Sequence, residues 1–439
     1  MPHAQPMLPR WIMAAAGTIL QLCLGTVYAW SFFQSILIRV YHWSNTASAW
    51  AFSFEILALG ISAAWAGFNL PRFGARRLAL TGAVLFSLSF LLAGWALRAH
   101  SVPLFYLGFS LVGGIGIGFG YVTPVATVAK WFPDRKGLVT GVVVMGFGFG
   151  AFVMSKLLAP LLLSVFKGDL VMVFEALAVV SAVVSIPSAL VLNEPPPGYA
   201  PGAPSVPTKA APVATRSPMA EPIGAYLLSR EFRFMWIAFF FNIGAGISVI
   251  SFQSSLLEEV WGAYDPTLEP TTLAGYGATL IAISSLFNGC GRLLWGMVAD
   301  RIGRAECFRL LLASQMIVFG LLLTVHNPWL FGALVCYVLL CFGGGFGVMP
   351  SFVLDVFGSQ RMSMIYGSML TAWAAAGIAG PVIMAAWRDN FPDRAVIDGF
   401  LTGVLFLGSG FICSFLLSND HCRPGTPPLN DLGLPSAGA

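Results

Sequence analysis

The stretch GFNLPRFG, residues 67–74, recurs in its main features as GMVADRIG, residues 296–303. Each copy follows a long apolar run, and the two copies begin 229 residues apart (from 67 to 296). A similar spacing relates the glycine-rich run before Pro124 to the glycine-rich run before Pro350. A repeat of this length predicts a chain built from two copies of one structural unit.

Apolar runs make up most of the chain: 57% of the 439 residues are hydrophobic and only 10% are charged. Soluble proteins carry about 25% charged residues, so this composition excludes a soluble enzyme, a nucleic-acid binder and a disordered scaffold. About 20 apolar helical residues cross the roughly 30 Å hydrocarbon core of a bilayer. Twelve runs meet this length, at residues 11–33, 48–68, 78–97, 104–128, 137–163, 171–191, 234–256, 273–298, 307–324, 328–353, 364–386 and 399–417.

These runs predict an all-α membrane protein with twelve transmembrane helices in two pseudo-symmetric six-helix bundles. The Pro- and Ala-rich string PPPGYAPGAPSVPTKAAP separates the sixth run from the seventh and is typical of a flexible linker. The expected domains are a bundle at 1–192, a cytoplasmic linker at 193–229, a second bundle at 230–420 and a flexible tail at 421–439. Two halves in the same orientation favour transport by alternating access.

Lysine and arginine predict the orientation. Sixteen of the 23 lie in segments on the same side as the termini, five lie in loops on the other side, and Lys156 and Arg292 lie within runs. Because basic residues concentrate in cytoplasmic loops, both termini are expected in the cytoplasm.

The repeated loop resembles the signature loop of the major facilitator superfamily. WFPDRKGL (131–138), YAW (28–30), FNGCGR (287–292) and DVFG (355–358) are similar to the oxalate/formate antiporter and bacterial monocarboxylate transporter branch. The resemblance implies exchange or symport of a small carboxylate through a cavity between the halves. It also implies a multi-pass protein of the bacterial cytoplasmic (inner) membrane, acting as a monomer.

The chain departs from the family pattern at two positions. Pro71 stands where the first signature loop has an acid, whereas the second loop keeps Asp300. Trp373 stands where the oxalate exchangers carry a lysine, so a dicarboxylate would lose a cationic partner. The residues expected to act in gating are Asp134, Arg135, Asp300, Arg301 and Arg304.

Arg292 is the residue most strongly indicated as functional. An arginine within a span costs about 2.5–3.5 kcal/mol on insertion scales, and its planar fork matches a carboxylate. The alternative is that Arg292, about 12 Å from the loop at Asp300, extends its side chain towards that loop. The resemblance favours substrate binding, and Asn288, one turn earlier, could donate to the substrate or orient the guanidinium.

Aromatic residues complete the predicted site. Tyr28, Trp30 and Tyr121 lie in the first and fourth runs, which line the cavity in this superfamily. Phe346 and Trp373 are the candidates from the second half. Since 13% of the chain is aromatic, simple packing against other helices or lipid is the alternative for each.

Glu55 is an acid about 13 Å inside the second run. Burial favours the neutral form of a carboxyl group, so Glu55 could take up a proton and couple it to anion movement. The alternative is a structural acid, hydrogen-bonded within the bundle or paired with a base such as Lys156.

No metal-ligand spacing, nucleophile–base set or phosphate loop occurs, so no metal, cofactor or enzymatic activity is expected. The leading prediction is a secondary transporter of a small monocarboxylate of the lactate, pyruvate or formate class, with H⁺ as the candidate coupling ion. An oxalate/formate exchanger is one alternative, and a transporter-like sensor is another.

Overall fold

The structure is a computed structural model that describes residues 10–132, 135–196, 199, 223–358 and 361–419. Within these residues, twelve helical segments are long and apolar enough to cross a membrane, which confirms the predicted all-α fold. The predicted linker lies largely outside the described residues and the predicted tail lies wholly outside them. The domain boundaries therefore stay predictions.

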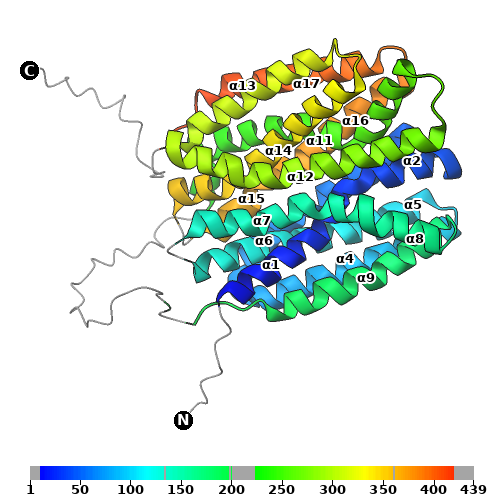
Figure 1. The fold of residues 1–439 in the computed structure, drawn as a ribbon. Helices are drawn as coiled ribbons and strands as arrows, with labels where there is room; N and C mark the ends of the chain where they lie inside the picture. The colour runs from blue at the N-terminus through cyan, green and yellow to red at the C-terminus, as the bar shows by residue number, and fades with distance from the viewer. Residues whose placement is uncertain (1–9, 133–134, 197–198, 200–222, 359–360, 420–439) are drawn as a thin grey trace, which may run out of the picture.

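Helices α1 to α9 form one group, called here the N-terminal half, and α11 to α17 form the C-terminal half (Figure 1). The N-terminal half contains α1 (Arg10–Leu24), η1 (Gly25–Ala29), α2 (Trp30–Tyr41), α3 (Asn45–Phe73), α4 (Ala75–Arg98), α5 (Val102–Phe105), η2 (Tyr106–Val112), α6 (Gly113–Trp131), α7 (Lys136–Phe152), η3 (Val153–Leu158), α8 (Ala159–Val165) and α9 (Leu170–Val191).

After the short helix α10 (Ile223–Leu227), the C-terminal half contains α11 (Arg230–Tyr264), α12 (Pro270–Ile302), α13 (Arg304–Leu322), α14 (Pro328–Phe357), α15 (Met362–Met369), α16 (Thr371–Asn390) and α17 (Ala395–Ser414). Several helices are longer than the apolar runs that predicted them; α11, for example, exceeds the predicted 234–256 at both ends. The length criterion measures only the hydrocarbon core, and helices continue into the polar layers beyond it.

Each copy of the repeated loop ends a helix at a glycine. Helix α3 ends at Gly74 with φ 78° and ψ 158°, and α12 ends at Gly303 with φ 94° and ψ 155°. Residues with a side chain rarely adopt a positive φ, which explains the glycine at the end of each copy. The two copies are therefore structurally equivalent at this turn.

Four spanning segments are not continuous α-helices. The first contains the 3₁₀ turn η1, and the fourth and fifth contain the π-helical turns η2 and η3. The eleventh is interrupted at Leu370, between α15 and α16. Such irregular turns within helices often lie at functional sites.

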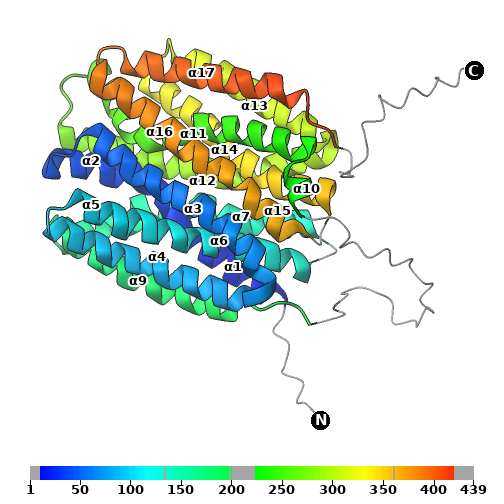
Figure 2. The ribbon, with the colours of Figure 1, turned by 180° about the vertical axis from the view of Figure 1, so that it is seen from behind.

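The two halves meet mainly at two places. Helix α7 lies beside α12 (Figure 1), and α3 lies beside α15 and α16 (Figure 2). Glycines allow this close approach: a Cβ atom on Gly67 would lie 2.2 Å from the carbonyl oxygen of Ser363, and one on Gly289 would lie 2.2 Å from the ring of Phe149. Side chains from α7 and α12 can therefore meet at the centre of the molecule.

Candidate functional site

Arg292 lies on α12 at the interface between the halves and is 1% exposed. Its Nη1 atom donates to the carbonyl oxygen of Val144 on α7 at 2.9 Å, and lies 3.5 Å from the hydroxyl of Tyr121 on α6. The guanidinium is thus directed at the N-terminal half, rather than towards the loop at Asp300 as the alternative interpretation required. An arginine of one half is held by the main chain of the other.

The other edge of the guanidinium carries Nε and Nη2. Both nitrogens are buried, and neither has a hydrogen-bond partner among the described residues. In arginine these two N–H groups point the same way and form a fork that matches the two oxygens of a carboxylate. Because a buried charge without a partner is costly, this edge is suited to an anion.

Aromatic rings enclose the guanidinium. Its central carbon lies 5.4 Å from the ring centroid of Phe147 and 5.1 Å from that of Phe346, within cation–π range. Trp373 packs against Phe346 and Tyr121, with ring centroids 4.7 and 5.3 Å away. Tyr28 joins the same group, 5.1 Å from Phe147. We call Arg292, Tyr28, Tyr121, Phe147, Phe346 and Trp373 the central cluster; its rings are all 0–2% exposed.

Asn288 lies one turn before Arg292 on α12 and is also buried. Its Oδ1 atom has no partner among the described residues. Asn288 and Tyr28 line a cavity of about 10 Å³ between the halves, together with Gln253, Ser284 and Ser285. This volume is near the minimum for one water molecule, so the amide borders a small polar space next to the central cluster.

Trp30 is the predicted aromatic residue that lies apart from this group. Its ring packs against Phe52, Phe105 and Phe109 inside the N-terminal half, at centroid distances of 6.3, 6.3 and 5.5 Å. A substrate contact for Trp30 stays a prediction, and the structure brings the other six predicted substrate residues together at the interface.

The prediction did not include Phe147 or Tyr366. Phe147 lies in the string GFGFG, whose glycines drew attention to helix packing only. Tyr366 immediately precedes Gly367 on α15, and its buried side chain lies within electrostatic range of Arg292 and Tyr121. The signal in each case was an aromatic residue beside glycines in a helix that borders the interface.

Glu55 is 1% exposed and points into the N-terminal half. A Cβ atom on Gly113 of α6 would lie 3.4 Å from its Oε1 and 2.9 Å from Oγ of Ser89 on α4. Neither carboxyl oxygen has a hydrogen-bond partner among the described residues. The suggested pairing with Lys156 is wrong, because Lys156 lies on η3 and donates to Oγ1 of Thr279 on α12 at 2.6 Å.

The predicted gating residues of the second signature loop form an ion-pair chain. Nη2 of Arg304 lies 2.6 Å from Oδ1 of Asp300, and its Nε lies 3.1 Å from Oδ2 of Asp355 on α14. All three belong to the C-terminal half, so these pairs do not cross the interface. Arg301 and Arg135 are exposed, and Asp134 lies outside the described residues.

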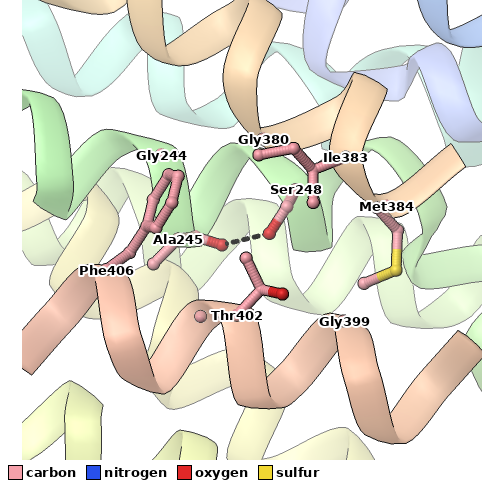
Figure 3. A pocket seen from close by; sticks show the side chains of 10 residues that line it. Gly244, Ala245, Ser248, Gly380, Ile383, Met384, Gly399, Thr402 and Phe406 are labelled. Atoms are coloured by element: carbon pink, nitrogen blue, oxygen red, sulfur yellow. Dashed lines mark hydrogen bonds between the residues drawn. The ribbon is translucent and has the colours of Figure 1, made fainter. Parts of the chain in front are cut away.

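A further cavity, of about 10 Å³, lies among α11, α16 and α17 (Figure 3). Its lining is mostly apolar, and the hydroxyl of Ser248 already donates to the carbonyl oxygen of Ala245 at 2.7 Å. Like the cavity beside Asn288, it has room for about one water molecule. In the described part of the chain, no three His, Cys, Asp or Glu residues are grouped as a metal site.

Twelve spanning helices and a buried arginine between two halves define a multi-pass transporter. Residues 15–381 match the sequence model of the Major Facilitator Superfamily, and the chain belongs to this superfamily. The resemblance inferred from the motifs is therefore confirmed.

Several relatives are named for small carboxylates. The chain is 27% identical to the oxalate:formate antiporter of Oxalobacter formigenes, over 87% of this chain and 86% of that protein. It is 26% identical to apicoplast pyruvate carrier 1 of Toxoplasma gondii (84% and 82% covered) and 27% identical to human monocarboxylate transporter 11 (92% and 82%). The solved nucleoside transporter NupG shares the fold with a TM-score of 0.64 at 13% identity, covering 92% of this chain and 98% of NupG.

Proposed function

We propose that this protein is a secondary active transporter of a small monocarboxylate of the lactate, pyruvate or formate class. The observation that carries the proposal is the buried Nε and Nη2 edge of Arg292, which has no partner among the described residues. One fixed cation neutralises one carboxylate, and the fork accepts both carboxylate oxygens. Alternating access follows from the location of this edge between two halves.

The surroundings of Arg292 support one carboxylate rather than two. Trp373 occupies the position of the lysine in the oxalate exchangers and is fully buried against Phe346 and Tyr121. Lys156, the other basic residue within a span, is exposed and bonded to Thr279. Oxalate:formate exchange is the second candidate, because the Oxalobacter relative with that name matches this chain over most of its length.

The rest of the proposal concerns coupling, gating and location. Glu55 would carry a proton with the anion, since its buried carboxyl group makes no hydrogen bond in the described residues. The chain Asp300–Arg304–Asp355 would brace the C-terminal half during opening. The protein would act as a monomer in a bacterial inner membrane with both termini in the cytoplasm, in keeping with its distribution of lysine and arginine.

Uptake of labelled lactate and labelled oxalate into proteoliposomes tests the proposal. Arg292→Lys should raise the KM for lactate about 10- to 100-fold, because a point charge cannot replace two charge-assisted hydrogen bonds. Arg394→Lys is the matched control. Because the side chain of Arg394 is 73% exposed, this variant should transport lactate with the wild-type KM. Tight oxalate exchange by the wild type would overturn the monocarboxylate preference, and lactate binding without flux would indicate a sensor.

A further inference from the structure

Three tyrosine side chains from three different helical segments surround Arg292: Tyr28 and Tyr121 lie beside it, and Tyr366 lies beside Tyr121. Tyr28 comes from η1, Tyr121 from α6 and Tyr366 from α15, and each lies within electrostatic range of the guanidinium. All three side chains are at most 2% exposed. Hydroxyl groups of two tyrosines of the central cluster, and that of Tyr366 beside it, are therefore buried near Arg292.

Two of these hydroxyls are only weakly engaged by the described residues: Tyr28 lies near Arg292, and Tyr366 lies near Tyr121. Tyr121 is in reach of Nη1 of Arg292 at 3.5 Å, whereas the hydroxyls of Tyr28 and Tyr366 make no hydrogen bond of acceptable geometry within the described residues. Buried tyrosine hydroxyls normally find a partner. Tyr28 and Tyr366 thus resemble the free edge of Arg292: polar atoms are buried at one place with unused capacity.

The backbone at both tyrosines is irregular. Tyr28 lies in the 3₁₀ turn η1, and Tyr366 lies one turn before the interruption at Leu370. In transporters, interrupted helices commonly form the substrate site. These positions support a role in binding over a role in helix packing.

A carboxylate held by Nε and Nη2 directs its α-carbon away from the guanidinium, one bond beyond the carboxyl carbon. An oxygen on that carbon, either a keto or a hydroxyl group, can hydrogen-bond to a nearby tyrosine, because a phenol both donates and accepts. An acid with only hydrogens on the α-carbon would leave the tyrosines without partners. Sites built to bond a substrate oxygen reject analogues that lack it for this reason.

We infer that Tyr366, assisted by Tyr28, selects 2-oxo and 2-hydroxy monocarboxylates over unsubstituted acids of the same length. This inference rests on the proposed function, because it requires a carboxylate on Arg292. Tyr366 is the main determinant because it belongs to the same half as Arg292. If the halves move as units, these two residues stay together throughout the cycle, whereas Tyr28 approaches Arg292 only when the halves close.

Competition in proteoliposomes tests the inference. Labelled 2-hydroxypropanoate uptake is measured against unlabelled 2-hydroxypropanoate, 2-oxopropanoate and propanoate. For the wild type, we expect the two substituted acids to inhibit at concentrations about 10-fold or more below propanoate, which is about the effect of one hydrogen bond. In Tyr366→Phe this ratio should fall to about one to two, because the 2-substituted acids weaken while propanoate does not.

Tyr106→Phe is the matched control. It removes a hydroxyl that donates to the carbonyl oxygen of Ala47 at 2.8 Å, away from the central cluster, so the inhibition ratio should stay at the wild-type value. Equal inhibition by propanoate and 2-hydroxypropanoate in the wild type would overturn the inference without any variant. An unchanged ratio in Tyr366→Phe would overturn the assignment to Tyr366. Failure of every monocarboxylate to bind would instead refute the proposed function.

Discussion

Asp389, the penultimate residue of α16, caps a helix of the other half. Its carboxylate accepts from Nδ2 of Asn45 and from the backbone N–H of Thr46, both at 2.9 Å, and from the hydroxyl of Thr46. These donors lie at the N-terminus of α3, where a negative charge is favourable. Asp389→Ala is expected to favour separation of the halves at this end.

The size of the effect follows from these contacts. An N-terminal cap contributes about 0.5–2 kcal/mol, and a charge near a helix N-terminus contributes about 0.3–1 kcal/mol. Asp389 is exposed, so the sum should lie near the low end, at about 1–2 kcal/mol. Because the bonds exist only when α3 and α16 are together, their loss should raise the ratio of open to closed forms about 5- to 30-fold.

Distances between spin labels would measure this ratio. Labels carried by non-canonical amino acids at His100 and His326, in turns at the same end of the two halves, leave the native cysteines unchanged. Asp389→Ala should add or enlarge a population with longer distances. Asp393→Ala removes an exposed acid from the following turn and should leave the distances alone. If the Asp389→Ala distribution matches the wild type, Asp389 does not hold this end closed.

Three further changes test other parts of the structure. Glu55→Gln should abolish proton uptake during anion transport but keep substrate binding, because an amide cannot carry the proton; unchanged proton and substrate accumulation, followed with a trapped pH dye, would exclude coupling through Glu55. Gly289→Ala places a methyl group against Phe149 and should destabilise the closed form by about 1–3 kcal/mol, visible as a lower Tm and slower turnover; wild-type values of both would refute the close-packing argument. Arg304→Ala should lower the Tm only slightly, because both of its carboxylate partners, Asp300 and Asp355, are exposed, and a large loss of stability would contradict this reasoning.

The spanning helices were predictable because the length of an apolar run directly reflects the thickness of the bilayer. The direction in which a side chain points from its helix was harder to predict from the sequence. Tyr28 lies in the 3₁₀ turn η1 and Trp30 begins α2, so these two side chains, two residues apart, point to different sides and only Tyr28 reaches Arg292. The depth of both residues was apparent from the sequence, but the face was not.

Local changes of helix type explain another error. Lys156 lies on the π-helical turn η3, which alters the register of every side chain after it. Nothing in the composition of that run marks the turn, so the contact of Lys156 with Thr279 could not be foreseen. Tyr366 was missed because the sequence alone does not show which of many aromatic residues share one cluster.

The bond from Arg292 to Val144 ends on a main-chain carbonyl. Side-chain substitutions at position 144 keep this acceptor. This hydrogen bond between the halves therefore tolerates mutation of Val144 but depends on the side chain of Arg292. The hydrogen bond to Val144 uses Nη1, which leaves Nε and Nη2 for an anion. Substrate binding and contact between the halves therefore use different N–H groups of Arg292, and both can form at the same time.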